Sequence, residues 1–372
     1  MSRVILFRRT KVSFRDNFQR RLARPEGSGE PMKRPTIRDV AQRAGVSKSL
    51  VSLVYTRPHT VSETRRQLVL DAAEELGFRP NLVARSLAGT GSGFFAILVA
   101  DLHNPLFAEI VDAARFTLAA AGEVSLMTSA ALPRLDDQHI LDRRLLSLFH
   151  DLRPKGILIV GSVPDMQEIG GLALNVPVVV ASAIPEGLPH ARTVRGDDTA
   201  GMRMVVRHLA EQGHRRIAHL GGEGGPVSVA RAAAYSEAMV ELGLGDHIRI
   251  SAADYSEAAG YAAAQQVLDD PAPPSAITAV NDLAAVGAMA AIAGYAERTG
   301  NQVALTGYDN TYLSGLREIG LTTIDPGNEA IGSLAAAMLI EEPGDAQERE
   351  HVATPSLIIR RSSASPSLVE PA

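Results

Sequence analysis

From Phe94 onward, short apolar runs alternate with alanine-rich stretches, and this alternation constrains the possible fold more than any other feature of the chain. The runs have the length of buried strands, and the stretches between them have the length of helices. Strand and helix in alternation predict parallel sheets with helices on both faces, and about 270 residues are enough for two such units. The predicted strands are 94–100, 156–160, 176–181, 217–220, 276–280 and 303–308, and the predicted helices include 107–121, 201–212, 229–242 and 283–300.

In open parallel sheets, small molecules bind at the carboxyl ends of the strands, so the loops after the strands are expected to carry any ligand chemistry. Several of these loops hold polar groups suited to hydroxyl or amide recognition. They are 101–104, 161–163, 182–184, 221–226, 281–282 and 309–311.

Three short helical patterns come before this region, in the residues that follow Pro35. Thr36 is a good N-cap for the first helix, Ser47 caps the second, and the third begins at Ser62. Two short helices around a turn at Gly45, with small polar and basic side chains at the start of the second, suit insertion into a DNA major groove. Such patterns also arise by chance in alanine-rich helical proteins, so the motif alone favours DNA binding without establishing it.

Within this segment, Lys48 and Ser49 are predicted to meet base edges, where a lysine can donate to guanine O6 and N7. Other polar residues are predicted to donate to phosphates, which fixes the position of a protein on DNA without reading its sequence. They are Thr36, Ser47, Ser52, Ser62 and Arg66.

The net charge of −5 conceals an asymmetry along the chain. Residues 1–90 carry a net charge of +10, and the remainder carries −15. A basic end on an acidic body indicates that a polyanion binds near the N-terminus. With 45% hydrophobic and 21% charged residues, the composition is that of a globular protein rather than of a disordered chain.

Residues 1–33 are predicted to form a disordered basic extension, and Met32 is a candidate for the natural first residue. No apolar run is long enough to span a membrane, and the short Val4–Phe7 run, followed at once by arginines, does not suit a secretory signal. The chain has no cysteine, which excludes disulfides and cysteine-ligated metals and is compatible with a reducing compartment. The sequence therefore predicts a cytoplasmic protein, associated with the nucleoid through DNA binding.

The stretch from Thr36 to Ser52, TIRDVAQRAGVSKSLVS, is followed by Val61-Ser62, by LGFRPN at 76–81 and by ARSLA at 84–88. Together these motifs closely resemble the DNA-binding headpiece of the lactose/galactose repressor (LacI/GalR) family. The resemblance continues through the body, in the motifs NPLF at 104–107, GHRRIA at 213–218, ND at 281–282, GYDN at 307–310 and LTTI at 321–324. Only the first 33 residues and the tail after Arg361 lie outside it.

By position, the resemblance implies that Lys48, Ser49 and Leu53 read bases and that Leu87 wedges into a central minor-groove step, flanked by Asn81 and Ala84. Unstacking a step costs a few kcal/mol but kinks the duplex toward more protein contact. The lactose repressor has a basic residue at the position of Leu53, so contact with a thymine methyl is expected here instead, on a different operator.

The implied fold class is α/β: an all-α helix-turn-helix headpiece and a periplasmic-binding-protein-like body of two doubly wound parallel-sheet subdomains, with an effector between them. The predicted domains are a headpiece at 34–80, a hinge helix and linker at 81–93, and a body at 94–361, followed by a disordered tail at 362–372. The first subdomain is predicted at 94–193 and 312–341, and the second at 194–311 and 350–361.

The resemblance also implies an effector site for a sugar or related metabolite. Its predicted residues are Asn104, Phe107, Arg231, Tyr255 and Asp282. Each of the last three has a structural alternative. Arg231 could pair with Glu237 or Glu241 on its own helix, Tyr255 could serve only in packing, and Asp282 could cap the following helix.

Enzyme signatures are missing from the sequence: it has no His-Glu-x-x-His pair, no Gly-x-Ser-x-Gly elbow and no Walker loop. We therefore expect no catalytic residues, no metal and no cofactor. The predicted function is an effector-controlled repressor that binds a pseudo-palindromic operator as a homodimer, without a membrane. No leucine heptads follow Arg361, so a tetramer is not expected. The alternative is a sugar-binding protein whose N-terminal segment does not bind DNA.

Overall fold

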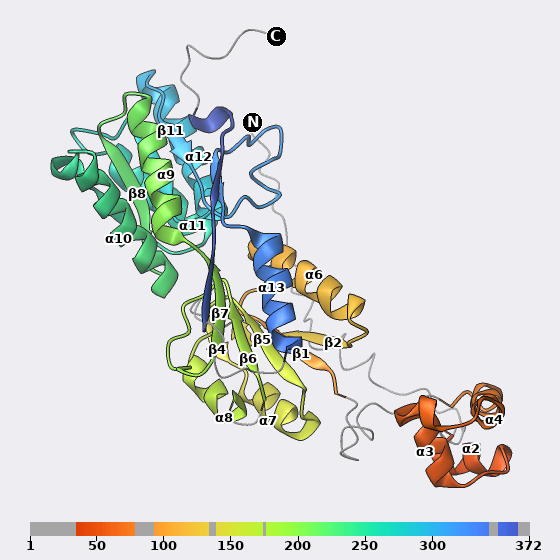
Figure 1. Ribbon diagram of the computed structural model, residues 1–372. Coiled ribbons are helices and arrows are strands. Elements are labelled where there is room, and N and C mark those ends of the chain that lie inside the picture. The colour runs from red at the N-terminus through yellow and green to blue at the C-terminus, as the bar shows by residue number, and fades with distance from the viewer. Residues whose placement is uncertain (1–34, 79–92, 134–138, 174–175, 342–348, 364–372) are drawn as a thin grey trace, which may run out of the picture. The chain divides into compact units, whose positions relative to one another are not determined.

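The computed structural model describes residues 35–78, 93–133, 139–173, 176–341 and 349–363, and the chain divides into two compact units at residue 90 (Figure 1). We call the described part of the first unit the headpiece and the second unit the body, and each is considered by itself. Among the described residues, none of the helices combines the length and the apolarity needed to cross a bilayer.

The headpiece consists of helices α2 (Ile37–Arg43), α3 (Lys48–Thr56) and α4 (Glu63–Glu75), with a 3-10 turn, η1 (Pro58–Thr60), before α4. The Asp39 carboxylate accepts from the Thr36 backbone N–H at 2.7 Å, and the Ser47 hydroxyl accepts from the Leu50 N–H at 3.2 Å, as the N-cap predictions require. The turn between α2 and α3 holds Gly45 at a φ of +67°, which only glycine adopts without strain. The helices share a small core of valines and alanines: Val40, Ala41, Ala44, Val51, Val54, Val69, Ala72 and Ala73.

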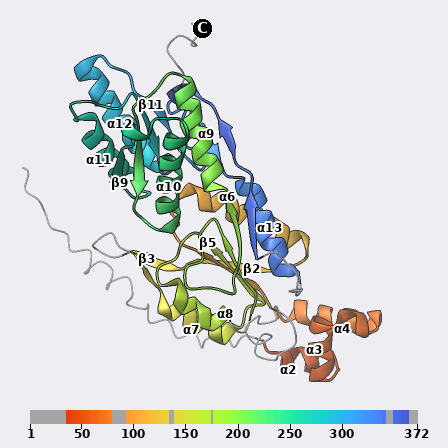
Figure 2. The same ribbon diagram turned by 60° about the vertical axis from the view of Figure 1, so that its left-hand side comes forward.

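The first lobe of the body is built on a six-stranded sheet of order β13-β7-β6-β5-β1-β2, all parallel. Its strands are β1 (Phe95–Val99), β2 (Ser125–Ser129), β5 (Gly156–Val160), β6 (Val178–Ala181), β7 (Arg192–Gly196) and β13 (Glu350–Ala353). Helices α6 (Pro105–Ala120) and α13 (Asn328–Ile340) lie side by side on one face (Figures 1 and 2). Helices α7 (Arg143–Leu152) and α8 (Gly170–Ala173) cover the other (Figure 1). A small hairpin of β3 (Ala131–Pro133) and β4 (His139–Leu141) and the turn η2 (Met166–Ile169) complete the lobe.

The second lobe has a parallel four-stranded sheet of order β11-β10-β8-β9. Its strands are β8 (Ile217–Gly222), β9 (Ile250–Ala253), β10 (Ala276–Ala279) and β11 (Ala304–Thr306). Helices α9 (Asp198–Glu211) and α10 (Pro226–Glu241) bury one face of this sheet, and α11 (Glu257–Leu268) and α12 (Asp282–Thr299) bury the other. A turn, η3 (Gly245–His247), precedes β9, and a ribbon of β12 (Thr323–Asp325) paired with β14 (Ser356–Ile358) leads to the turn η4 (Arg361–Ser363).

The chain passes between the lobes three times: from β7 into α9, from β12 into α13, and from β13 into β14. The three crossings touch one another. A Cβ on Gly196 would meet Pro326 at 2.7 Å, one on Gly327 would lie 3.5 Å from Ala353, and the Asp197 N–H donates to the Ala353 carbonyl at 3.1 Å.

This arrangement differs from the predicted subdomain boundaries. Residues 194–196, predicted for the second subdomain, form the end of β7 in the first lobe, and two further segments also differ. Residues 312–325, predicted for the first subdomain, belong to the second lobe, because Leu321 and Ile324 are buried in its two cores. The strand β13, predicted for the second subdomain, pairs with β7 of the first lobe. Both segments lie close to crossings, where the sequence pattern does not show on which side of a crossing a short strand pairs.

Candidate DNA-binding and effector sites

The outward face of α3 carries the side chains predicted to meet DNA bases. Lys48, Ser49 and Leu53 are exposed, and Leu53 keeps 38% of its surface accessible. Val51 and Val54, on the other face, are buried in the headpiece core. The helix therefore presents a cation, a hydroxyl and an apolar group together, and these are the kinds of group that read base edges and thymine methyls in a major groove.

The residues predicted to hold phosphates gather at helix starts. Thr36, Ser47 and Ser62 are the N-caps of α2, α3 and α4. Helix N-termini present unpaired backbone N–H groups and a partial positive charge, so they favour anions. Arg66 lies one turn into α4, in an ion pair of 2.6 Å with Glu63, and Ser52 is half-buried on α3. The hinge residues Asn81, Ala84 and Leu87 lie outside the described residues, and their roles stay predictions.

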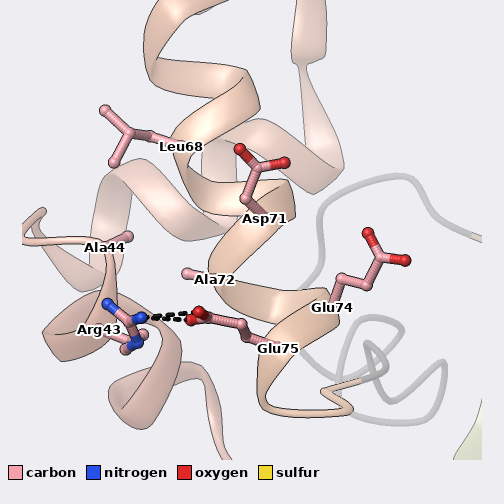
Figure 3. A pocket seen from close by; sticks show the side chains of 7 residues that line it. All are labelled: Arg43, Ala44, Leu68, Asp71, Ala72, Glu74 and Glu75. Atoms are coloured by element: carbon pink, nitrogen blue, oxygen red, sulfur yellow. Dashed lines mark hydrogen bonds and ion pairs between the residues drawn. The ribbon is translucent and has the colours of Figure 1, made fainter.

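A surface hollow of about 440 Å³ lies on the headpiece between the end of α2 and the second half of α4 (Figure 3). Leu68 and the alanines Ala44 and Ala72 form its apolar wall, and the other lining residues are Arg43, Asp71, Glu74 and Glu75. Arg43 is paired with Glu75 at 2.6 Å, so the hollow is acidic as a whole. It involves no residue of α3 and does not suit phosphate.

In the body, Arg231 on α10 lies at the centre of a buried polar cluster. Its Nε donates to Asp198 at 2.8 Å, and its Nη1 donates to Asp309 at 3.2 Å and to the Val280 carbonyl at 2.6 Å. The guanidinium carbon lies 3.6 Å from the centroid of the Tyr308 ring. Burial lowers the pKa of Arg231, but the attraction of the two carboxylates outweighs it and raises that pKa above its ordinary value, so the guanidinium stays charged.

Asp309 reaches Arg231 from a strained loop that follows β11. Asp309 and Asn310 have φ angles of +104° and +46°, in a region that residues other than glycine rarely adopt. Strain of this kind persists where the surrounding structure fixes it, and it concentrates at functional sites. Burial raises the pKa of Asp309 to about 7, against the opposing effect of Arg231.

Tyr255, two residues after β9, lies close enough to this cluster for the charges of Arg231, Asp309 and Asp198 to act on it. Burial raises its pKa to about 12, while the charge of Arg231 acts in the opposite direction. A Cβ on Gly224 would lie 3.1 Å from the Tyr255 ring, so the glycine loop after β8 packs directly on this tyrosine. Arg231 and Tyr255, predicted from distant positions in the sequence, are therefore brought together.

Asp282 is buried beside this cluster, but its carboxylate is occupied by its own loops. It accepts from the Thr311 N–H at 2.7 Å, from the Thr311 hydroxyl at 2.9 Å and from the Thr323 hydroxyl at 2.6 Å. Burial nevertheless raises its pKa to about 6. The cap of α12 is Asn281 rather than Asp282, because the Asn281 side chain accepts from the Ala284 N–H at 2.8 Å.

Asn104 and Phe107 lie at the start of α6 in the first lobe. The Asn104 side chain caps this helix by accepting from the Leu106 N–H at 3.1 Å, and only 9% of each residue is exposed. Phe107 packs on the loop after β5, since a Cβ on Gly161 would meet its ring at 2.4 Å. Both residues therefore line the carboxyl-terminal edge of the first sheet, as Arg231 and its partners line that of the second.

Comparison with known proteins agrees with this organisation. The family described as bacterial regulatory proteins, lacI family, matches residues 36–81, and the periplasmic binding protein-like domain matches residues 206–363. The HTH-type transcriptional repressor CytR of Escherichia coli (strain K12) is 30% identical over 337 residues, which cover 88% of this chain and 96% of CytR.

The chain belongs to the lacI family of bacterial regulatory proteins. It is accordingly a DNA-binding transcriptional regulator, and the predicted fold class is confirmed.

Solved structures of lacI-family proteins show the same architecture. A lac repressor dimer bound to operator and the anti-inducer ONPF is 25% identical with a TM-score of 0.74, over 90% of this chain and all (100%) of the repressor chain. A complex of the transcriptional regulator CelR with cellobiose is 26% identical with a TM-score of 0.61, over 89% of this chain and 100% of CelR.

The two carboxylates that hold Arg231 were not predicted as site residues. Asp309 stands in one of the loops expected to carry ligand chemistry, within the GYDN motif, so its position was a usable signal. Asp198 gave no such signal, because it opens α9 at a crossing and reaches Arg231 only in the folded body. The alternative partners Glu237 and Glu241 do not hold Arg231, and Glu241 instead binds Arg203 at 2.8 Å. Within the described residues, no group of acidic residues and histidines is arranged to hold a metal.

Proposed function

We propose that this lacI-family regulator is a repressor that binds a pseudo-palindromic operator as a homodimer. Binding of a small molecule in the body either lowers or raises its affinity for the operator. The observation that carries the DNA-binding part is the exposed face of α3, with Lys48, Ser49 and Leu53 side by side. The lac repressor dimer, of the same fold, is solved on its operator, which supports the dimer and the operator as partners.

In the proposed complex, Lys48 donates to a guanine edge, Ser49 adds a less selective hydrogen bond, and Leu53 contacts a thymine methyl. Thr36, Ser47, Ser62 and Arg66 hold phosphates. Leu87 wedges into the central minor-groove step between Asn81 and Ala84 of the hinge.

Removal of the Lys48 ammonium tests this assignment. A bidentate contact to a base is worth about 1–3 kcal/mol, and a dimer makes the contact in both half-sites. Lys48→Ala should therefore weaken binding to a selected operator by roughly 5- to 150-fold for each half-site in a gel-shift titration. The matched control is Arg298→Ala, which removes an exposed cation from α12 in the body. Equal affinity of Lys48→Ala and the wild type would refute the role of Lys48.

The effector is proposed to be a sugar or a related hydroxyl-bearing metabolite, bound where Arg231 and Tyr255 face Asn104 and Phe107. Hydroxyl groups both donate to carboxylates and accept from a guanidinium, and Tyr255 offers an aromatic face. The CelR structure with cellobiose supports this class of ligand. Asp282 is kept in the proposed site, although its three internal hydrogen bonds favour a role in shaping the loops.

Thermal-shift screening against sugars and nucleosides tests the effector class. A ligand present at a hundred times its dissociation constant should stabilise the body by about 2.7 kcal/mol. Arg231→Lys keeps the charge but loses the planar fork, so it should abolish the shift from any active compound while the protein stays folded. A wild-type thermal shift in this variant would show that Arg231 does not bind the effector.

The chain is proposed to act in the cytoplasm, on the nucleoid, and to have no catalytic activity, since the relatives named above are regulators. A sugar-binding protein without a DNA-binding role is the competing proposal. It predicts that the wild type enriches no sequence from a randomised DNA pool.

A further inference from the structure

The ion pairs of Arg231 are part of a longer series of ion pairs, in which basic and acidic side chains alternate. Asp198 holds Arg231 with one oxygen at 2.8 Å and faces Arg195 with the other at 3.5 Å. Arg195 in turn binds Glu350 at 2.7 Å. The order is Glu350, Arg195, Asp198, Arg231 and Asp309, in which acidic and basic side chains alternate. We call these five residues the charge chain.

The charge chain runs from one lobe to the other across the crossings. Arg195 lies on β7 and Glu350 on β13, both in the first lobe, while Arg231 and Asp309 belong to the second. Asp198 is the first residue of α9, directly after the β7–α9 crossing. The Arg195–Asp198 contact therefore spans the β7–α9 crossing, and the Arg195–Glu350 pair joins β7 to β13, the strand that leads into the β13–β14 crossing.

The third crossing is tied to the same point by a hydrogen bond. The Asn328 amide, at the start of α13, donates to the Asp309 carbonyl at 2.8 Å and to Glu109 on α6 at 2.9 Å. One residue thus connects the strained loop that carries Asp309 to a helix of the first lobe.

The inner residues of the charge chain are buried, whereas the outer two are partly exposed and can be substituted at lower cost. The side chains of Arg231, Asp198 and Asp309 are at most 8% exposed, whereas those of Arg195 and Glu350 are 26% and 51% exposed. Buried ion pairs resist solvent screening, and a buried charge left without its partner is costly. An anionic or hydroxyl-bearing ligand that engages the Arg231 guanidinium therefore competes with Asp198 and Asp309 for the same charge.

We propose that the charge chain couples the state of Arg231 to the relative orientation of the two lobes, with Asp198 as the positioning residue between effector site and crossings. This coupling rests on the proposed function. It adds the residues through which effector binding at Arg231 changes the orientation of the lobes. Asp198 acts through Arg231 and Arg195, and the coupling is lost when any member between Glu350 and Arg231 loses its charge.

Inter-lobe distances measured by pulsed electron paramagnetic resonance test the coupling without knowledge of the effector. The chain has no cysteine, so Ser147→Cys on α7 and Ala233→Cys on α10, both exposed, place one spin label on each lobe. Asp198→Asn, Arg195→Gln and Glu350→Gln are compared in this background. The last two remove partly exposed charges, so they report on the coupling even if Asp198→Asn folds poorly.

The matched control is Arg203→Gln, which breaks a two-bond pair with Glu241 at 2.8 Å that lies wholly within the second lobe. We expect the three charge-chain variants to shift or broaden the inter-lobe distance distribution and Arg203→Gln to leave it unchanged. The same variants should change the dissociation constant for an operator duplex, selected by the wild type from randomised DNA, by about fivefold or more.

Unchanged distances in Arg195→Gln and Glu350→Gln would overturn the proposal, and so would changed distances with unaltered operator affinity. If the wild type selects no operator, the proposed function fails, but the distance measurements still decide whether the charge chain sets the lobe orientation.

Discussion

His219 on β8 is an unusual residue to find inside a sheet. It is completely buried, its Nδ1 lies 2.8 Å from the Thr278 hydroxyl, and its ring stacks on Tyr235 at a centroid distance of 5.3 Å. Burial, aided by the charge of Arg231, lowers its pKa to about 3. The imidazole is therefore neutral in the folded body near pH 7.

This predicts a pH dependence of stability with a definite sign. As the pH falls below about 6.5, the unfolded chain binds a proton at His219 that the folded chain does not bind, so the contribution of His219 to stability decreases until about pH 3. Between pH 7 and pH 5 the loss is about 2 kcal/mol. The unfolding free energy of the wild type and of His219→Leu should be measured with urea at pH 7 and at pH 5. The change between the two pH values should differ between the two proteins by about 2 kcal/mol. An equal loss in both proteins would contradict the depressed pKa.

A second prediction concerns Asp282, whose carboxylate accepts three hydrogen bonds from Thr311 and Thr323. In Asp282→Asn, one acceptor becomes a donor that faces other donors, so we expect a loss of about 1–3 kcal/mol in unfolding free energy. Thermal denaturation of this variant decides between a loop-shaping and a purely ligand-binding carboxylate. Wild-type stability together with lost effector binding would favour the latter.

At the scale of single residues, the sequence led to the prediction of Arg231 and Tyr255 as site residues, but it did not reveal the residues that surround them. Asp198 and Asp309 come from a helix start and a strained loop that are distant in the chain, and only the fold brings them to one guanidinium. Asp282, by contrast, was predicted from the family resemblance, and the motif does not show that the carboxylate oxygens already accept hydrogen bonds from Thr311 and Thr323.

Among the elements, α11 and α12 make the closest helix contact in the second lobe. A Cβ on Gly287 would lie 1.9 Å from the Glu257 carbonyl oxygen, and one on Gly260 would lie 2.0 Å from the Ala284 carbonyl oxygen. Side chains at either position would force the backbones apart. These two glycines allow the backbones of α11 and α12 to approach closely, although glycine has a low helix propensity.

Alanine substitutions in α12 should separate these two effects. Gly287→Ala should destabilise the body by about 1–3 kcal/mol through overpacking, despite the better helix propensity of alanine. Gly294→Ala in the same helix has only the flexible end of Arg298 at 3.6 Å, so it should be neutral or stabilising by up to about 1 kcal/mol. Equal effects in calorimetry would mean that α11 and α12 are not tightly packed.

Several central strands were predictable because strands that are buried on both faces of a parallel sheet have continuous apolar sequences. Strands β1, β5 and β6 all fall within predicted runs. Strands β2, β7, β9 and β13 were missed. The edge strands β2 and β13 have exposed apolar residues, Leu126, Met127 and Val352, and polar neighbours. The strand β7 lies inside the sheet, but it carries Arg192 and Arg195 and so has no continuous apolar run. The hairpin and the β12–β14 ribbon were missed for a similar reason: they are short and lie outside the main sheets.

For the whole molecule, the sequence indicated two functions in one chain, and the crossings between the lobes are where our proposal connects them. The basic N-terminal region precedes an acidic two-lobed body, and the lobes are joined by three crossings that pack on one another. A change in lobe orientation must pass through these crossings, which is where the charge chain runs. The lobe boundaries themselves were not predictable, because pairing of β13 with β7 spans more than 150 residues of sequence.

The central claim is that α3 of this regulator reads a symmetric DNA site, and selection from randomised duplex DNA tests it most directly. The wild type should enrich a pseudo-palindrome. Leu53→Arg should change the preferred base at one position in each half-site, toward guanine, and leave the other positions as they were. Failure to enrich a symmetric site, or an identical site for both proteins, would contradict the account.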